Sequence, residues 1–188
     1  MTVSFSLGER AGVRASQAHF LLPGGACDVA RDNATDDNVD VWNFYDTSQK
    51  YVGVKSVCSN SVASPAICTV KLNLKRSTGI APSGTLKVGI YSHSSTVPGS
   101  LIGGWSDTIN ASTLTASHAT YTLANISMGA GLTATTTYWV VCGWSGSSTT
   151  DYPQWSQVRY TGNDAISEDG TSWTAYDTAT EYFELFSQ

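Results

Sequence analysis

The stretch ICTVKLNLK at residues 67–75 decides the fold, because apolar and polar residues alternate along its whole length. Successive side chains of an extended chain point to opposite faces, so the alternation gathers the apolar side chains on one face. That face carries Cys68, Val70, Leu72 and Leu74, and the polar face carries Thr69, Lys71, Asn73 and Lys75. The pattern predicts a strand of an antiparallel sheet, buried on one face and exposed on the other.

Segments on both sides of this stretch have the same character. TTYWVVCGW at 136–144 is apolar on both faces, which is typical of a central strand in a packed sheet. Strand segments follow one another without a helical segment between them, and this favours a sandwich or barrel over a βαβ fold. The other predicted strands are KYVGVKSVC at 50–58, TLKVGIYS at 85–92, ATYTLANIS at 119–127 and TEYFELFS at 180–187.

Turn residues separate these strands. APSG at 81–84 and VPGS at 97–100 are Pro/Gly turns, and Asp169-Gly170 predicts a two-residue hairpin turn. The sequence therefore predicts an all-β chain, an antiparallel two-sheet β-sandwich that is jelly-roll-like and has about eight strands. The predicted core consists of Val70, Leu72, Leu74, Leu86, Val88, Ile90, Val140, Cys142, Phe183 and Leu185.

The first 48 residues differ from the rest of the chain. TVSFSLG and RASQAHFLL each have the character of a short strand, whereas residues 24–40 are acidic and loop-like. We therefore expect an N-terminal arm or edge extension over residues 1–48 and a β-sandwich domain over residues 49–188. Since residues 24–40 offer little apolar surface, the arm is expected to become ordered on a partner, with Phe5 and Phe20 as apolar anchors.

The composition excludes several classes of protein. Charged residues are 13 % of the chain, about half of the usual share, which is unlike a coiled coil or a charged disordered tail. The net charge of −5 provides no electrostatic footprint for nucleic acid, so no such partner is expected. No apolar run approaches the roughly 18 residues of a membrane span, so no membrane partner is expected.

The N-terminal segment does not have the pattern of a signal peptide. Its longest purely apolar stretch is Phe20-Leu21-Leu22, whereas a secretory signal needs about 7–15 apolar residues. The low charge and the many Ser and Thr residues are nevertheless typical of extracellular or virion proteins. Synthesis in a host cytoplasm and release by lysis reconcile these observations, so we expect a virion-surface location, with an extracellular location as the alternative.

The four cysteines do not form a metal-binding pattern. Cys58 and Cys68 lie at matching heights on a predicted hairpin, which makes a cross-strand disulfide a candidate. The alternative is that both are small buried apolar residues. Cys142 lies inside an apolar strand and is predicted to be a free core residue.

No constellation of catalytic residues is visible, so the chain is predicted not to be an enzyme. Glu168 precedes a turn and is expected to be solvated, and Glu181 and Glu184 lie on opposite faces of one predicted strand, so they cannot face each other across a cleft. The histidines are scattered, and His93 is expected at the surface.

One acidic segment resembles the opening of a calcium loop. Asp36, Asn38 and Asp40 have the right spacing, but Val41 and Thr47 stand where an EF-hand requires Gly and Glu. An EF-hand is therefore excluded, and a non-standard structural calcium site is the only cofactor left open, against the alternative of a flexible acidic loop.

The aromatic residues provide the candidate binding surface. Tyr138, Trp139 and Trp144 fall in the predicted central strand and are expected in the core. A second group falls in or beside polar loops, where flat rings stack on sugars or anchor protein interfaces, the alternative being that they cap the core. This group consists of Tyr152, Trp155, Trp173 and Tyr176.

Four segments, in order, resemble a known family. They are KLNLKRSTGIAPSGTLKVGIYSHSSTVPGSLIG at 71–103, LTATTTYWVVCGW at 132–144, SEDGTSW at 167–173 and FELF at 183–186. Together they are similar to the β-sandwich module named choice-of-anchor R and its phage-borne relatives, over residues 51–186. The resemblance implies a fold like that of carbohydrate-binding jelly rolls, in extracellular modules or accessory proteins of tailed phages, and it supplies no catalytic residues.

These observations lead to two expectations of function. The first is a non-enzymatic virion structural protein, a capsid decoration or tail accessory protein of a tailed phage, that binds other virion proteins as a homo-oligomer or lattice. The alternative is a secreted or surface glycan-binding module whose partner is a cell-surface glycan. The N-terminal arm favours the first, because a protein assembled into a lattice needs a tether and a freestanding lectin does not.

Overall fold

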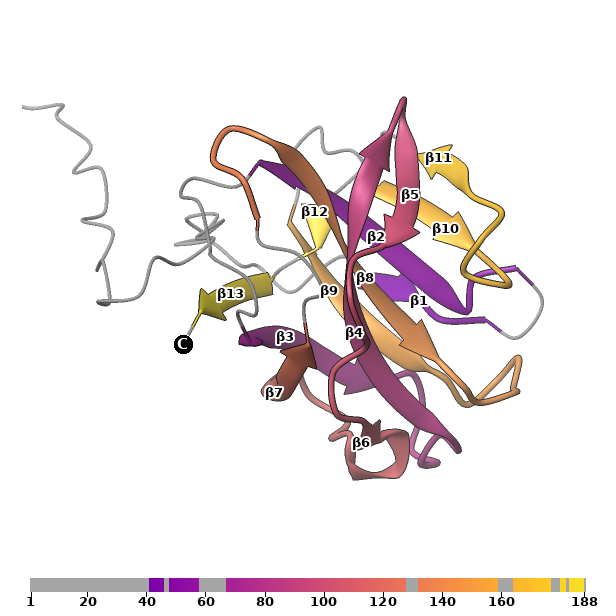
Figure 1. Ribbon diagram of the computed structural model, residues 1–188. Coiled ribbons are helices and arrows are strands. Elements are labelled where there is room, and N and C mark those ends of the chain that lie inside the picture. Colours follow the sequence, from indigo (N-terminus) through magenta and orange to yellow (C-terminus); the bar gives the residue numbers. More distant parts are fainter. Residues whose placement is uncertain are drawn as a thin grey trace, which may run out of the picture.

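The computed structural model describes residues 41–45, 48–57, 67–127, 132–158, 164–176, 180–181 and 183–187. Within these residues the chain forms strands, with one 3-10 turn at Ala111–Thr113 and no α-helix. The strands form two antiparallel sheets that pack together (Figure 1). The predicted two-sheet β-sandwich is confirmed. The described strands number thirteen rather than about eight, because several edge strands have only two or three residues.

The first sheet has six strands and is built around β3 and β9. β7 pairs with one edge of β3, and β1 pairs with one edge of β9. The bounds are β1 (Val41–Asn43), β3 (Ile67–Arg76), β7 (Ala119–Ser127), β9 (Pro153–Val158), β12 (Thr180–Glu181) and β13 (Phe183–Ser187).

The end of the chain completes this sheet between β3 and β9. These two strands pair with each other only at Leu74, Lys75 and Arg76 of β3. Beyond that point β12 pairs with β9, and β13 pairs with β3. Since Leu72 pairs with Tyr121 of β7 and with Phe183 of β13, β13 lies on the edge of β3 that faces β9.

The second sheet has seven strands in the order β11-β10-β2-β8-β4-β5, with β6 also paired to β4. As predicted, the segment that is apolar on both faces is central, because β8 lies between β2 and β4. The bounds are β2 (Tyr51–Val57), β4 (Thr85–Ser94), β5 (Val97–Leu101), β6 (Ile109–Asn110), β8 (Thr137–Trp144), β10 (Asp164–Ser167) and β11 (Thr174–Tyr176).

The main core lies between the two sheets. The prediction of the core is confirmed for eight residues, all buried: Val70, Leu72, Leu74, Leu86, Val88, Ile90, Val140 and Cys142. The side chains of Phe183 and Leu185 lie outside the described residues. The predicted core residue Trp144 is also buried here, together with two large rings that the alternation did not place there, those of Phe44 and Trp155.

The described part of the segment before residue 49 adds an edge strand to the sandwich. β1 pairs with β9 through Val41, Trp42 and Asn43, and Phe44 is fully buried in the core. This part of the segment that was expected to form an arm or edge extension therefore covers an edge of β9.

The predicted hairpin between residues 50–58 and 67–75 is wrong. β2 pairs with β8 and β10 in the seven-stranded sheet, whereas β3 belongs to the six-stranded sheet. The chain therefore crosses from one sheet to the other between them. The candidate disulfide loses the hairpin on which it rested, and Cys58 and the side chain of Cys68 lie outside the described residues.

Candidate functional site

The seven-stranded sheet buries side chains on both faces. Its inner face contributes to the main core, and its outer face carries a second apolar cluster of buried residues, which are Tyr91, Trp139, Val141 and Ala165. The edge strand β5 covers this cluster, because it contacts β2 and β10 in addition to its partner β4. The sheet therefore curls around its own outer face (Figure 1).

Glycines on the outer face allow large side chains to lie on the strand backbone. A Cβ at Gly89 would lie 2.6 Å from Cδ1 of Leu101 and 3.0 Å from Cε3 of Trp105. A Cβ at Gly143 would lie 2.5 Å from Cε1 of Tyr51. Real Cβ atoms essentially never lie closer than 3.0 Å to such atoms, so a Cβ at Gly89 would displace Leu101 and crowd Trp105, and a Cβ at Gly143 would displace Tyr51.

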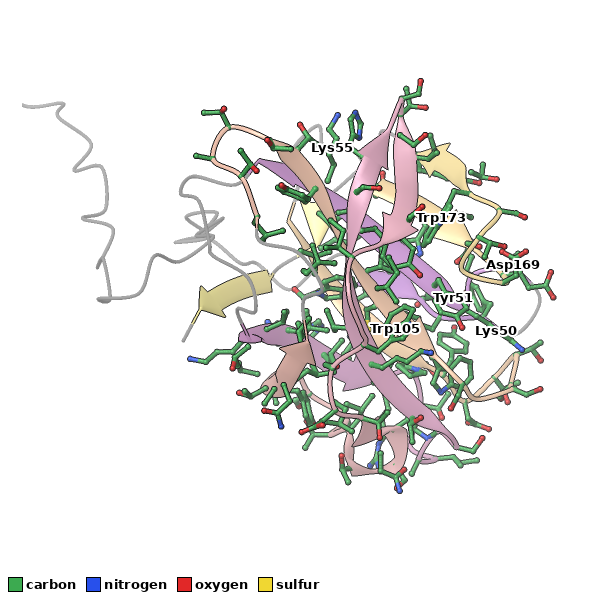
Figure 2. The ribbon with its side chains drawn as sticks, in the orientation of Figure 1. Lys50, Tyr51, Lys55, Trp105, Asp169 and Trp173 are labelled. Atoms are coloured by element: carbon green, nitrogen blue, oxygen red, sulfur yellow. The ribbon has the colours of Figure 1, made fainter. Side chains whose placement is uncertain are left out.

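Four aromatic rings form a connected group here, which we call the outer-face aromatic cluster: Tyr51, Tyr91, Trp105 and Trp173. The ring centroid of Trp105 lies 6.0 Å from that of Tyr51 and 5.8 Å from that of Tyr91. Tyr91 also meets Trp173 edge-on at 5.8 Å. Tyr91 is buried, whereas Tyr51, Trp105 and Trp173 are half-buried and keep part of their surface in solvent. Figure 2 labels these three residues on the outer face.

Hydrogen bonds along β4 hold Trp105 in this cluster. The chain after β5 stays beside β4, where the N–H of Ile102 donates to the carbonyl oxygen of Ile90 over 2.7 Å. Ser106 is bonded twice to Val88: its N–H donates to the carbonyl, and its hydroxyl accepts the Val88 N–H over 2.9 Å. These contacts fix the residues on both sides of Trp105, so its ring is directed onto Gly89.

Lys87 brings a positive charge to the cluster. It projects from the outer face of β4 beside Gly143, and its Nζ lies 4.2 Å from the ring centroid of Trp105 and 6.0 Å from that of Tyr51. Burial lowers the pKa of Lys87. Among the described residues, no hydrogen-bond acceptor or carboxylate pairs with this ammonium group, so its interactions there are with the two rings.

The loop between β10 and β11 borders the cluster. Ile166 pairs with Thr174, so the connection is longer than the two-residue hairpin that Asp169-Gly170 predicted. In this longer loop the Asp169 carboxylate accepts the N–H groups of Thr171 and Ser172 over 2.7 Å each. These bonds hold the pKa of Asp169 well below its usual range.

The same loop connects to the cluster through Tyr91 and Trp173. The Tyr91 hydroxyl donates to the carbonyl oxygen of Gly170 over 3.4 Å. Burial and the neighbouring Tyr51 raise the pKa of Tyr91 to about 12. The indole Nε1 of Trp173 is buried and has no hydrogen-bond partner within the described part of the chain.

Of the four aromatic residues predicted to form a binding surface, Trp155 is buried and the prediction for it is wrong, whereas Trp173 lies in the outer-face aromatic cluster. Trp155 was expected beside a polar loop, but it is 0 % exposed and lies in the main core between Trp42 and Leu74 of the neighbouring strands. It has no free ring face. Trp173 is half-buried in the outer-face aromatic cluster.

The other two predicted aromatics lie elsewhere. Tyr176 is 40 % exposed on the edge strand β11, with its ring 5.7 Å from Trp42 of β1. Tyr152 packs edge-on against Tyr45, with centroids 4.6 Å apart, and donates to the Tyr45 hydroxyl over 3.4 Å. This bond raises the pKa of Tyr152 to about 12. The four predicted aromatics therefore do not form one surface.

Several predicted site residues cannot be placed. Phe5 and Phe20 lie outside the described residues, as do Asp36, Asn38 and Asp40. Within the described residues, no group of three His, Cys, Asp or Glu side chains is arranged to hold a metal ion.

The predictions for Glu168 and His93 agree with the structure, because both are exposed. His93 also has a structural contact that the sequence did not indicate: its Nδ1 accepts the indole N–H of the buried Trp139 over 3.0 Å. Tyr138 is only half-buried, whereas the predicted core positions of Trp139 and Trp144 are confirmed.

Sequence reasoning missed Tyr51, Trp105 and Lys87. Tyr51 and Lys87 occupy the polar-face positions of their alternating strands, where solvent exposure is the usual expectation. One signal was available: Gly53, Gly89 and Gly143 recur on those same outward positions, and glycine in a strand marks close approach of another group.

The outer-face aromatic cluster can bind a ligand in two ways, through the exposed parts of its rings and through the ammonium of Lys87.

Among the described residues, no helix is long and apolar enough to cross a membrane. No protein-family model matches this chain, and searches of curated proteins and of solved structures return no match.

Proposed function

We propose that this chain is a non-enzymatic virion structural protein, a capsid decoration or tail accessory protein of a tailed phage. It binds other virion proteins, as a homo-oligomer or lattice, and displays its β-sandwich on the particle. Residues 1–40 act as the tether.

The outer-face aromatic cluster is the observation that carries a binding role. A sheet of an antiparallel sandwich ordinarily buries one face and exposes the other as a polar surface. Here the outer face instead holds four large rings, three of them partly in solvent. Aromatic residues are enriched at binding surfaces, which supports a protein that acts through contacts. The virion setting is supported by the ordered sequence resemblance to phage-borne modules.

The test is attachment to particles. Phage particles from the producing host are purified on a density gradient and probed for this protein, and purified protein is added back to particles that lack it. We expect co-purification, and we expect removal of residues 1–40 to abolish rebinding. Absence of the protein from intact particles would refute the virion role, and unchanged affinity of the truncated protein would refute the tether.

A glycan-binding module of the cell surface or the extracellular medium is the second candidate. The half-buried rings of Tyr51, Trp105 and Trp173 favour it, because partly exposed rings can stack on sugars. A glycan array probed with the full chain tests it. A specific hit that Trp105→Ala removes, without particle attachment, would replace the virion proposal.

A further inference from the structure

Lys87 is a cation of the outer face that has no counter-charge among the described residues. The Lys87 side chain is half-buried and its ammonium lies over two rings, yet no carboxylate of the described residues pairs with it. Burial of an ammonium is unfavourable unless an anion or polar group compensates it.

The nearby acidic groups do not fill this role. Asp169 lies in the loop that borders the cluster, but its carboxylate already accepts the N–H groups of Thr171 and Ser172 and the hydroxyls of Ser167 and Ser172. Figure 2 shows Asp169 on the outer rim of that loop, beyond Tyr51 and Trp105. Glu168 is exposed in the same loop. Within the described part of the chain, the ammonium of Lys87 therefore remains available to an anion from outside.

The rings beside Lys87 determine the shape of what can bind. Tyr51 and Trp105 lie 6.0 Å apart with their planes inclined at 45°, and the Lys87 ammonium is over both. A ligand at this position meets partly exposed ring surface and a cation together. A group with an apolar face and a carboxylate at its edge satisfies both contacts at once.

We propose that the outer-face aromatic cluster is a binding site for a saccharide that carries a carboxylate, such as a uronic or sialic acid unit. The carboxylate pairs with the Lys87 ammonium, and the C–H face of the sugar ring packs on Tyr51 and Trp105. This inference rests on the proposal that the outer face is a binding surface, and it does not depend on attachment to a particle.

A saccharide fits this site better than an acidic peptide does. A sugar ring is rigid and offers its C–H face and its carboxylate in one fixed unit, so little conformational entropy is lost when both contacts form. An Asp or Glu side chain brings the carboxylate on a flexible stem, without a face for the two rings. Pairing would also offset the burial that lowers the pKa of Lys87.

The experiment compares carboxylated oligosaccharides with matched neutral ones. The full chain is titrated calorimetrically with a panel of uronate- and sialate-containing oligosaccharides and with their carboxyl-reduced counterparts, which keep the ring geometry and lose the charge. We expect at least one carboxylated member to bind. Its reduced counterpart should have an affinity that is lower by about tenfold or more.

Two variants isolate the role of the charge. Lys87→Met keeps an apolar stem and removes the ammonium, and we expect about a tenfold loss of affinity or more. Lys55→Met is the matched control, because Lys55 projects from β2 at the opposite end of the outer face (Figure 2) and should leave affinity unchanged. The thermal unfolding curve of each variant verifies its fold, and a shift of the Trp105 indole resonance in the unmodified protein provides a readout that needs no variant.

Three results would overturn the inference: no binding by any carboxylated member, equal binding of the carboxylated and reduced members, or binding that Lys87→Met leaves intact. Preferential binding of an acidic peptide would assign the site to a protein partner instead. Each of these results leaves the particle-attachment test unaffected, so the two proposals can fail separately.

Discussion

Gly84 is a residue whose conformation and close packing both require the absence of a side chain. Its φ is +81°, and a Cβ there would lie 2.5 Å from the backbone nitrogen of Gly146. Its carbonyl oxygen accepts the N–H of Ala111 over 2.9 Å, which connects the start of β4 to the 3-10 turn. The group that an added Cβ would meet is backbone, which cannot rotate away as a flexible side chain would.

We expect Gly84→Ala to lower the free energy of unfolding by about 2 kcal/mol or more. The cost of holding alanine in the left-handed conformation adds to the cost of its steric overlap with the backbone. Urea unfolding followed by tryptophan fluorescence measures the loss. Gly79→Ala is the control: nothing lies within 4 Å of a Cβ there, so its effect should stay within about 0.5 kcal/mol. Equal stability of the two variants would contradict the assignment of Gly84 as a required glycine.

Two tyrosines make stability depend on alkaline pH. The pKa values of Tyr91 and Tyr152 are raised to about 12 from the ordinary value of 10.0, by burial for Tyr91 and by the bond to Tyr45 for Tyr152. Below pH 10 both phenols are protonated in the folded and the unfolded chain, so their contribution to the free energy of unfolding is fully present. Above it the unfolded chain loses these protons first, which favours unfolding.

Stability is therefore expected to fall as the pH rises from about 10 to about 12. Urea unfolding across this range measures the fall, and Tyr152→Phe should reduce the slope because it removes one of the two phenols. Ultraviolet titration of the folded protein should show late-ionising tyrosines. Complete ionisation of all tyrosines near pH 10 would contradict this expectation.

β8 is the element on which both apolar layers depend. It pairs with β2 along one edge and with β4 along the other, so its backbone groups are bonded on both sides. Val140 and Cys142 face the main core, and Trp139 and Val141 face the outer cluster. β11 is the opposite case, since among the described strands it pairs only with β10, and all three of its residues are exposed.

In native-state hydrogen exchange, the amides of β8 should therefore be among the most protected and the amides of β11 among the least protected. We expect the amides of β8 to exchange only through global unfolding and the amides of β11 to exchange through local opening. Mass spectrometry of peptides that cover residues 137–144 and 174–176 measures both. Equal protection of the two strands would show that the edge is held by a contact other than its pairing with β10.

At the scale of the whole molecule, the sandwich begins earlier in the sequence than residue 49. β1 covers an edge of β9, and Phe44 is buried against the main core. Two truncations separate an arm from a structural strand. Removal of residues 1–40 should leave cooperative unfolding and thermal stability unchanged, whereas removal of residues 1–48 also deletes β1 and Phe44.

The longer truncation should cost about 3 kcal/mol or more, because loss of one buried Phe side chain alone has this effect. Differential scanning calorimetry and urea unfolding of both proteins measure the difference. If the two truncated proteins were equally stable, β1 would be dispensable for the sandwich, and all of residues 1–48 would act as an extension. If removal of residues 1–40 were itself destabilising, the tether role would have to be abandoned.

Local alternation was enough to predict the strands and their inward faces. Val70, Leu72 and Leu74 in β3, and Leu86, Val88 and Ile90 in β4, are buried as expected. Trp155 could not be predicted in the same way, because its segment YPQWSQ has polar neighbours that resemble a loop. Its burial comes from Trp42 and Leu74, which pair with it from two other strands.

The sequence by itself determined the class of the fold, the central position of β8 and most of the core, because the side chains of a strand alternate between faces whatever its partners are. Only the tertiary structure decided that β2 and β3 lie in different sheets, and that Tyr51, Lys87, Trp105 and Trp173 meet on one outer face. These residues come from separate elements, and strand pairing and the curl of the sheet bring them together. Pairing is a competition among all strands for the same edges, and no local pattern in the sequence records its result.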